Sequence, residues 1–319
     1  MKISMIGSGR WGTFITWYLD SIGHTVKLYG PADTPHMQAL LATRSNGTVT
    51  LPESVELVCD IHALADADVI GISVPSQALH GLMGELRDAN LTDKKFVLCM
   101  KGIDIKSGKR LSEIASEGAG HDRVAVWIGP GHPQEFCRGI PNCMVIDSAN
   151  EALKRELVEA FSSKLIRFYY GSDLIGNEVG AAAKNVIGIA AGLLDGCELT
   201  SLKGALMSRG TREVSRLIAA MGGNGFSAYG LCHLGDYEAT VFSQYSHNRR
   251  FGEMFVRGEP YTELAEGYDT VKALCALADR YHVDLPIGRA VYAVLYDGAQ
   301  PKEQMNQLFT RSLKREFDI

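Results

Sequence analysis

The sequence predicts an α/β first domain, a mostly parallel sheet with helices on both faces, followed by an all-α second domain. Three observations support this prediction. A glycine-rich loop follows a short apolar strand at the start of the chain. Strand and helix patterns then alternate to about residue 170, and long helical patterns dominate afterwards. We place the boundary near residue 172, so the expected domains are 1–172 and 173–319.

The expected strands are short apolar runs bounded by turn residues, and the expected helices carry apolar residues at helical spacing. Ser76 is the expected N-cap of the helix that follows the third strand. The strands are Lys2–Ile6, Val26–Tyr29, Asp68–Val74, Lys95–Met100, Arg123–Ile128 and Cys143–Asp147. The helices are Trp11–Ile22, closed by Gly23, then Gly176–Leu194, Lys203–Ala220, Thr270–Tyr281 and Pro286–Tyr296.

Composition excludes several classes of protein. The net charge is −5 and there is no long basic run, so we expect no nucleic-acid partner. The most apolar stretch, Val186–Leu194, is too short to span a bilayer, so we expect no membrane insertion. The first residues form a strand pattern rather than a signal peptide, which favours a cytoplasmic location. Seven scattered cysteines without a CxxC pair predict reduced, buried thiols and no metal site.

The loop Gly7-Ser8-Gly9-Arg10-Trp11-Gly12 has the GxGxxG spacing of dinucleotide-binding domains. The first glycine permits a tight turn, the second allows close approach of a pyrophosphate, and the third allows close helix packing. The alternative is a glycine-rich turn without a ligand. The strand before the loop and the helix after it favour a Rossmann domain that binds NAD or NADP.

The residue that would bind the adenosine ribose is less clear from the sequence. An acidic residue after the second strand typically binds the ribose of NAD, and a nearby arginine suits NADP. Asp33 lies at about the right distance, and no arginine follows it directly. We therefore favour NAD, with a simple turn role for Asp33 as the alternative.

A second signal lies in the helix expected over Gly176–Leu194. Gly180, Lys184 and Gly188 recur every four residues and so share one helix face. Glycine costs helix stability, so the pattern indicates that something packs close to the backbone. A lysine buried there would have a lowered pKa and could act as an acid or base. The alternative is a surface lysine on a packing helix.

Taken together, the motifs resemble those of the bacterial NAD(P)-dependent glycerol-3-phosphate dehydrogenase family. They occur in order along most of the chain. They are Gly7–Thr13, Val74–Ala78, Met100–Ile103, Gly129–Glu135, Gly176–Asn185, Ser208–Glu213, Gly235-Asp236, Asn248–Gly252 and Glu266-Gly267.

The resemblance implies reversible, nicotinamide-dependent reduction of dihydroxyacetone phosphate to sn-glycerol 3-phosphate. Lys184 would be the acid/base, Lys101 would stabilise charge beside it, and Asp236 would orient Lys184. The implied substrate-binding residues are Lys101, Gly129, Gly131, Lys184, Asp236, Ser246, His247 and Asn248. The implied cofactor-binding residues are Gly7, Ser8, Gly9, Arg10, Trp11, Gly12, Asp33, Pro75, Lys101, Pro133, His247, Leu264 and Glu266.

Three departures from the family pattern leave alternatives open. His247 stands where the family usually has a phosphate-binding arginine, with Arg249 or Arg250 as candidates to compensate. Gly131 lacks a hydroxyl, and Pro133 replaces an alanine. No arginine that favours NADP follows the second strand.

These departures leave open an enzyme with the same chemistry on a different small hydroxyketone. A cofactor-binding sensor that has lost catalysis is a further alternative, and the presence of Lys101, Lys184 and Asp236 argues against it. The adjacent Lys184-Asn185 pair argues against the 6-phosphogluconate type of dehydrogenase, whose lysine and asparagine are spaced further apart. By resemblance, a homodimer is expected.

Overall fold

The structure is a computed structural model and describes residues 1–310. Its first part contains one eight-stranded sheet in the order β3-β2-β1-β4-β5-β6-β7-β8. All strand pairs are parallel except β6 with β7. The strands are β1 Lys2–Ile6, β2 Thr25–Tyr29, β3 Glu56–Val58, β4 Val69–Ile72, β5 Lys95–Leu98, β6 Val124–Ile128, β7 Asn142–Ser148 and β8 Ile166–Tyr170.

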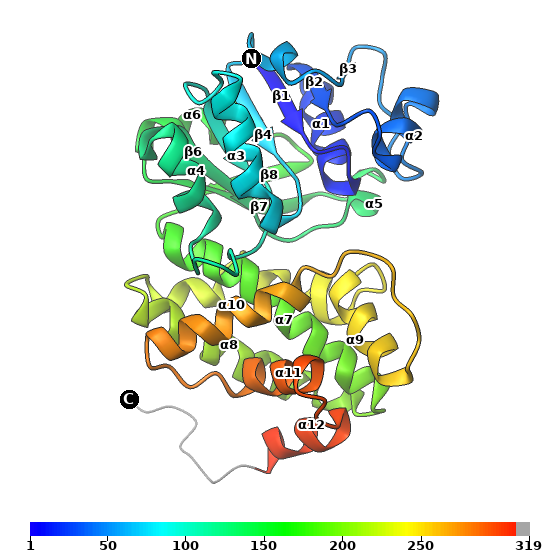
Figure 1. The fold of residues 1–319 in the computed structure, drawn as a ribbon, viewed down its shortest axis with the longest axis vertical. Coiled ribbons are helices and arrows are strands. Elements are labelled where there is room, and N and C mark those ends of the chain that lie inside the picture. Colours follow the sequence, from blue (N-terminus) through cyan, green and yellow to red (C-terminus); the bar gives the residue numbers. More distant parts are fainter. Residues whose placement is uncertain (311–319) are drawn as a thin grey trace.

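Helices cover both faces of this sheet, as predicted. Along β4 and β5 successive buried residues alternate between two apolar clusters, because neighbouring side chains of a strand point to opposite faces. One cluster includes residues of α1 and α6, and the other includes residues of α3 and α4. Figure 1 shows these helices around the sheet. The helices are α1 Arg10–Ser21, α2 Pro35–Thr43, α3 Leu79–Asp88, α4 Leu111–Ala119, α5 Pro133–Phe136 and α6 Glu151–Phe161.

The strand order reverses at β1, which pairs with β2 on one side and β4 on the other. In open parallel sheets such a switch point leaves a crevice at the carboxyl ends of the strands, where ligands bind. The glycine loop lies there, directly between β1 and α1.

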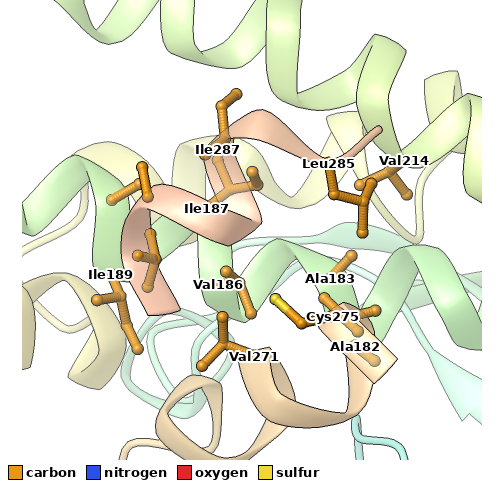
Figure 2. Packing of buried hydrophobic residues seen from close by; sticks show 14 of the residues in the cluster. Ala182, Ala183, Val186, Ile187, Ile189, Val214, Val271, Cys275, Leu285 and Ile287 are labelled. Carbon is orange, nitrogen blue, oxygen red and sulfur yellow. The ribbon is translucent and has the colours of Figure 1, made fainter. Parts of the chain in front are cut away.

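The second part is helical throughout its described residues, and α7 Leu174–Gly196 runs through its centre. Figure 2 shows Val186, Ile187 and Ile189 of α7 packed among side chains from the surrounding helices. The other helices are α8 Lys203–Ala220, α9 His247–Arg257, α10 Gly267–Arg280, α11 Pro286–Tyr296 and α12 Pro301–Phe309. Short turns of other helix types include η2 Ser76–Ala78, η5 Gly225–Tyr229, η6 Leu234–Asp236 and the π-helix η7 Glu238–Phe242.

The close packing expected at the α7 glycines is confirmed. A Cβ on Gly192 would lie 2.0 Å from the carbonyl oxygen of Arg249, and one on Gly252 would lie 2.3 Å from that of Ile189. The partner at this contact is therefore α9, whose backbone touches that of α7. The contact fixes the start of α9 relative to α7.

A buried carboxylate ties the two parts of the chain together. Glu178, in the first half of α7, accepts hydrogen bonds from Arg110 Nη1 at 2.7 Å, Ser112 Oγ at 2.6 Å and the Ser112 backbone N–H at 2.9 Å. Arg110 and Ser112 lie at the start of α4. This cluster holds α7 against the α/β domain.

Several sequence expectations need correction. The sequence patterns did not predict strands β3 and β8 or helices α2, α4, α5, α6, α9 and α12. Strand β3 is only three residues long, and α9 is mostly polar. Ser76 does not cap a helix, because its hydroxyl donates to Glu266. Cys99, Cys232 and Cys275 are buried as expected, whereas Cys59 and Cys137 are exposed.

The proposed boundary at 172 falls between the end of β8 and the start of α7. Residues 311–319 of the expected second domain lie outside the described residues. Within residues 1–310, no helix combines the length and apolar character needed to cross a membrane.

Candidate active site

Two lysines from different domains meet at one buried carboxylate. Lys184 Nζ, from the middle of α7, lies 2.6 Å from Asp236 Oδ2. Lys101 Nζ, beyond the end of β5, lies 2.8 Å from the same oxygen. The Asp236 side chain is 1% exposed, so the carboxylate is shielded from bulk water. The cluster therefore holds two cations and one anion at the domain junction.

The surroundings of Lys184 tune its proton affinity. Burial lowers the pKa of Lys184 to about 8, and the charge of Lys101 acts in the same direction, while the Asp236 carboxylate opposes both. Lys184 Nζ also donates to Thr240 Oγ1 at 2.9 Å. Thr240 lies in η7, and such π-helical turns occur frequently at functional sites. Lys184 is thus held in place and can exchange a proton near neutral pH, and it is not a surface lysine.

Gly129 and Gly131 shape the loop that faces this cluster. Lys101 Nζ donates to the Gly129 carbonyl at 2.6 Å. Gly131 has a φ of +138°, and a Cβ there would lie 2.3 Å from the ring of Phe136. A hydroxyl-bearing side chain at 131 would require Phe136 to move. The absence of a hydroxyl at 131 therefore fits the local packing.

The start of α9 forms the opposite end of the candidate site. Ser246 caps the helix, its Oγ accepting from the Arg249 N–H at 3.3 Å. Asn248 joins three elements, donating to Asn185 Oδ1 at 3.0 Å and accepting from the Gly267 N–H at 2.9 Å. His247 Nδ1 pairs with the Tyr261 hydroxyl at 2.7 Å. Burial lowers the pKa of His247, so its imidazole is neutral at pH 7.

Arg249 does not compensate for His247, because its guanidinium is paired elsewhere. Arg249 Nη1 lies 2.7 Å from Asp195 Oδ2 and 2.9 Å from Glu253 Oε2. Arg250 is exposed. These ion pairs argue against Arg249 as the compensating charge, and the alternative, Arg250, stays a prediction.

The glycine loop has the shape that a dinucleotide requires. A Cβ on Gly7, where φ is +115°, would lie 2.1 Å from the Ser73 carbonyl oxygen, and one on Gly12 would lie 2.0 Å from the Gly7 carbonyl oxygen. A Cβ on Gly9 would meet nothing within 4 Å. Two of the glycines thus serve chain packing, and the third leaves space beside the start of α1 for a pyrophosphate. These residues fit a dinucleotide.

The remaining predicted cofactor residues lie in different environments. Glu266 reaches across the domain junction and accepts from the backbone N–H and hydroxyl of Ser76, the residue after Pro75. Pro133 is buried at the first turn of α5. Leu264 is 58% exposed, and Asp33 is exposed in the turn before α2. Ser8 is buried, and the ring of Trp11 lies 6.4 Å from that of Phe136.

Three residues of the site were missed by sequence reasoning. Thr240 follows Asp236 by four residues in the sequence. This spacing could have indicated that the two side chains lie together. Asn185 was noted only for its place beside Lys184, yet it donates to the Lys101 carbonyl at 3.3 Å. His132 is buried with Nε2 unpartnered among the described residues, and burial lowers its pKa to about 4. The sequence around His132 gives no indication that this side chain is buried.

Comparisons with family models and with curated proteins agree on one protein family. The family model for the N-terminus of NAD-dependent glycerol-3-phosphate dehydrogenase matches residues 2–154, and the C-terminal model matches residues 173–306. A protein of Prosthecochloris aestuarii named glycerol-3-phosphate dehydrogenase is 38% identical, over 99% of this chain and all of that protein. One of Thermoanaerobacter with the same name is 33% identical, over 99% of both chains.

Solved structures show the same architecture. A glycerol-3-phosphate dehydrogenase of Coxiella burnetii has a TM-score of 0.91 at 28% identity, covering 97% of this chain and 99% of that one. A D-mandelate dehydrogenase with NADH shares only the fold, with a TM-score of 0.63 at 13% identity over 93% of this chain and 98% of that one. With both family models matched along almost its whole length, the chain belongs to the NAD-dependent glycerol-3-phosphate dehydrogenase family.

Proposed function

We propose that this protein catalyses the reversible NAD(P)-dependent reduction of dihydroxyacetone phosphate to sn-glycerol 3-phosphate. The observation that carries the proposal is the buried cluster of Lys101, Asp236 and Lys184 at the domain junction. Reduction of a ketone needs a proton donor and a positive charge near the carbonyl oxygen. In this cluster Lys184 can donate the proton, and Lys101 provides the positive charge.

The cofactor would lie over the glycine loop, with the N–H groups at the start of α1 available to its pyrophosphate. When bound, it supplies the hydride that the ketone carbon receives. The other protein residues that we assign to this side are Arg10, Trp11, Pro75, Pro133, Leu264 and Glu266. Glu266 already bridges the two domains through Ser76, so it would hold the helical domain against the cofactor side.

Lys184 acts as the acid in reduction. Negative charge develops on the carbonyl oxygen of the substrate, and protonated Lys184 donates to that oxygen. In oxidation the neutral amine accepts the hydroxyl proton instead. The lowered pKa of about 8 favours both exchanges near neutral pH. Asp236 positions the amine and stabilises its charged form, and Thr240 fixes its direction.

Lys101 supplies charge rather than a proton. It is held by Asp236 and by the Gly129 carbonyl, so its ammonium group has a fixed position beside Lys184. A fixed cation costs no reorganisation as the oxyanion develops. The cluster carries one positive charge in excess of its carboxylate, which suits an anionic substrate.

Two buried polar atoms near the cluster have no protein partner among the described residues, Asp236 Oδ1 and His132 Nε2. Buried polar atoms without partners are costly, and such atoms in functional sites are typically satisfied by a ligand. A small hydroxyketone offers a hydroxyl that can donate to Asp236 and a carbonyl oxygen that can accept. Gly131, Ser246, His247 and Asn248 would line the rest of the substrate site.

The preference for NAD over NADP stays a prediction, because Asp33 lies exposed in the turn before α2. The homodimer and the cytoplasmic location likewise stay predictions. The alternative of another hydroxyketone substrate finds no support in the names of the curated relatives.

The test follows NADH and NADPH oxidation separately, with dihydroxyacetone phosphate or dihydroxyacetone as the acceptor. We expect turnover with the phosphorylated ketone and a higher kcat/KM than with dihydroxyacetone. Equal kcat/KM values for the two acceptors would contradict the substrate assignment, and no oxidation of either cofactor with any ketone would indicate a sensor.

A further inference from the structure

A buried polar pair behind the lysine cluster takes no part in the mechanism described above. His233 and Tyr237 are both fully buried, and they lie on either side of Asp236 in the chain. The Tyr237 hydroxyl lies 2.6 Å from His233 Nε2, and the two rings meet edge to face with their centroids 4.8 Å apart. Burying polar side chains costs free energy that apolar residues would not cost, which makes this pair a candidate for a role in the reaction.

The hydrogen bonds of this pair have one possible direction. His233 Nδ1 lies 2.8 Å from the carbonyl oxygen of Gly180, and a carbonyl oxygen can only accept, so Nδ1 carries the proton. Burial lowers the pKa of His233 to about 4, so the ring is neutral at pH 7 and Nε2 carries no proton. The Tyr237 hydroxyl, whose pKa is raised by burial, therefore donates to Nε2.

His233 bonds the segment that carries Asp236 to the part of α7 that carries Lys184. Gly180 lies one helical turn before Lys184, so the imidazole is attached next to the acid. A Cβ on Gly180 would lie 3.1 Å from the Cβ of His233, which is closer than side chains usually pack. The glycine at 180 thus makes room for His233.

Tyr237 extends the contact to α8. A Cβ on Gly210 would lie 3.3 Å from the Tyr237 hydroxyl oxygen and 2.8 Å from Cδ1 of Ile187 in α7. The Tyr237 hydroxyl also interacts with that of Thr211, the next residue of α8. The turn η6 is therefore bonded to α7 through His233 and packed against α8 through Tyr237.

Asp236 needs this support because of how its carboxylate is held. Oδ1 has no hydrogen-bond partner among residues 1–310, and Oδ2 is held by Lys101 and Lys184. When Lys184 gives its proton to the substrate, one of these two attractions is lost. The position of the carboxylate then depends on its backbone, whose N–H donates to the His233 carbonyl at 3.0 Å.

We propose that His233 and Tyr237 are a positioning pair for the reaction, which together hold Asp236 in place beside Lys184 and Lys101 while the proton is transferred. The inference rests on the proposed function, because it concerns the acid and base of that reaction. The pair acts through the backbone of Asp236 and contacts neither ligand. Its loss should therefore change the rate of reduction and leave the binding of cofactor and substrate unchanged.

The test compares Tyr237→Phe with Tyr18→Phe. Each variant removes one hydroxyl from a fully buried ring, and the Tyr18 hydroxyl donates to the Phe161 carbonyl in the α/β domain, outside the site. We expect Tyr237→Phe to lower the single-turnover rate of ketone reduction about three- to tenfold, the worth of one hydrogen bond. The Kd of the reduced cofactor and KM for dihydroxyacetone phosphate should stay at wild-type values. Tyr18→Phe should lower the Tm by a similar amount and leave the rate unchanged.

Two further comparisons separate positioning from a general loss of stability. If the pair acts through Asp236, Tyr237→Phe should change the rate little in an Asp236→Asn background, where the carboxylate is already gone. His233→Asn, whose amide can still donate to the Gly180 carbonyl, should keep more of the rate than His233→Leu, which makes neither bond.

A second readout does not need turnover. The charged or titratable groups that act on Lys184 are Asp236, Lys101, Cys232, His132 and His233. Burial raises the pKa of Cys232 to about 12, so Asp236 is the negative group among them at pH 7, and a loosened Asp236 lowers the pKa of Lys184. NMR of isotope-labelled lysine side chains, with the Lys184 signal assigned by its absence in Lys184→Met, should show titration at lower pH in Tyr237→Phe and at the wild-type pH in Tyr18→Phe.

The outcomes distinguish the pair from the proposed function. An unchanged rate together with an unchanged Lys184 titration in Tyr237→Phe would overturn the role of the pair. Equal losses of rate from Tyr237→Phe in the wild-type and Asp236→Asn backgrounds would also overturn it. A wild-type enzyme that does not reduce dihydroxyacetone phosphate would contradict the proposed function instead, and the Lys184 titration would still test whether the pair holds Asp236.

Discussion

The two ends of the candidate site lie on α7 and α9, helices that pack against each other, and they differ in how charge is held. At the reacting end, Lys184 and Lys101 are paired with a carboxylate that is 1% exposed. At the end expected to bind the phosphate, called here the phosphate end, His247 is neutral and Arg249 is paired with Asp195 and Glu253. The first arrangement lets the protein set a proton affinity, and the second offers hydrogen-bonding groups at the start of α9.

This difference separates the two tasks of the site. A general acid needs an environment that does not change as ligands come and go, and burial with a fixed partner provides it. A phosphate site needs donors whose partners arrive with the substrate. Substitutions at the reacting end should therefore change kcat, whereas those at the phosphate end should change KM.

The largest effect is expected for Lys184→Met, which keeps the length of the side chain but removes the proton donor. We expect kcat for ketone reduction to fall about 10²–10⁴-fold, the usual contribution of a positioned acid. Lys154→Met is the control, since Lys154 is also buried and paired with an aspartate, Asp147, outside the site. Near-normal turnover by Lys184→Met would contradict the assignment of Lys184 as the acid.

Asp236→Asn should have the next largest effect, about 10²-fold on kcat at pH 7.5, with a change in pH dependence. The carboxylate raises the pKa of Lys184, so its loss should lower that pKa and move the alkaline fall of reduction to lower pH. Stopped-flow rates over a pH series measure this shift. Asp147→Asn serves as the control, and a pH limb that stays in place in Asp236→Asn would be inconsistent with the assigned coupling.

Thr240→Val should reduce kcat by up to about tenfold, the worth of one hydrogen bond. Valine has nearly the same shape and removes only the acceptor for Lys184. Thr240→Ser, which keeps the hydroxyl, should restore most of the rate. If valine and serine give the same kcat, the hydroxyl does not position Lys184.

The smallest effect is expected for His247→Arg alone, about a two- to fivefold decrease in KM for dihydroxyacetone phosphate with kcat unchanged. The added guanidinium is permanently charged, whereas the imidazole is neutral. Steady-state kinetics in low and high salt would measure the gain and its screening. A decrease in kcat without a change in KM would show that catalysis and phosphate binding are not divided between the two ends of the site.

The sequence predicted the reacting end well and the phosphate end less well. Lys184 could be recognised because a lysine among glycines and alanines is chemically conspicuous, and the Gly180–Gly188 spacing indicated close packing. The ion pair of Arg249 could not be foreseen, because its partner, Asp195, lies 54 residues away in the chain and meets it only in the folded domain.

The parts of the fold that could be predicted are those with a strong local sequence pattern. The glycine loop and the central strands have strong patterns, whereas β3 has three residues and β8 has exposed tyrosines, Tyr169 and Tyr170, at its end. The hydroxyl of Ser76 is used by Glu266, 190 residues later, which no local capping rule could reveal.

The most direct test of Lys184 as the shared acid and base is the pH dependence of kcat/KM in both directions. Burial places the pKa of Lys184 at about 8, so reduction by the protonated amine should fall as pH rises through that region. Oxidation of sn-glycerol 3-phosphate by the neutral amine should rise through the same region, giving two limbs of opposite slope with a common midpoint. Limbs of the same direction, or no limb between about pH 7 and 9, would contradict this assignment.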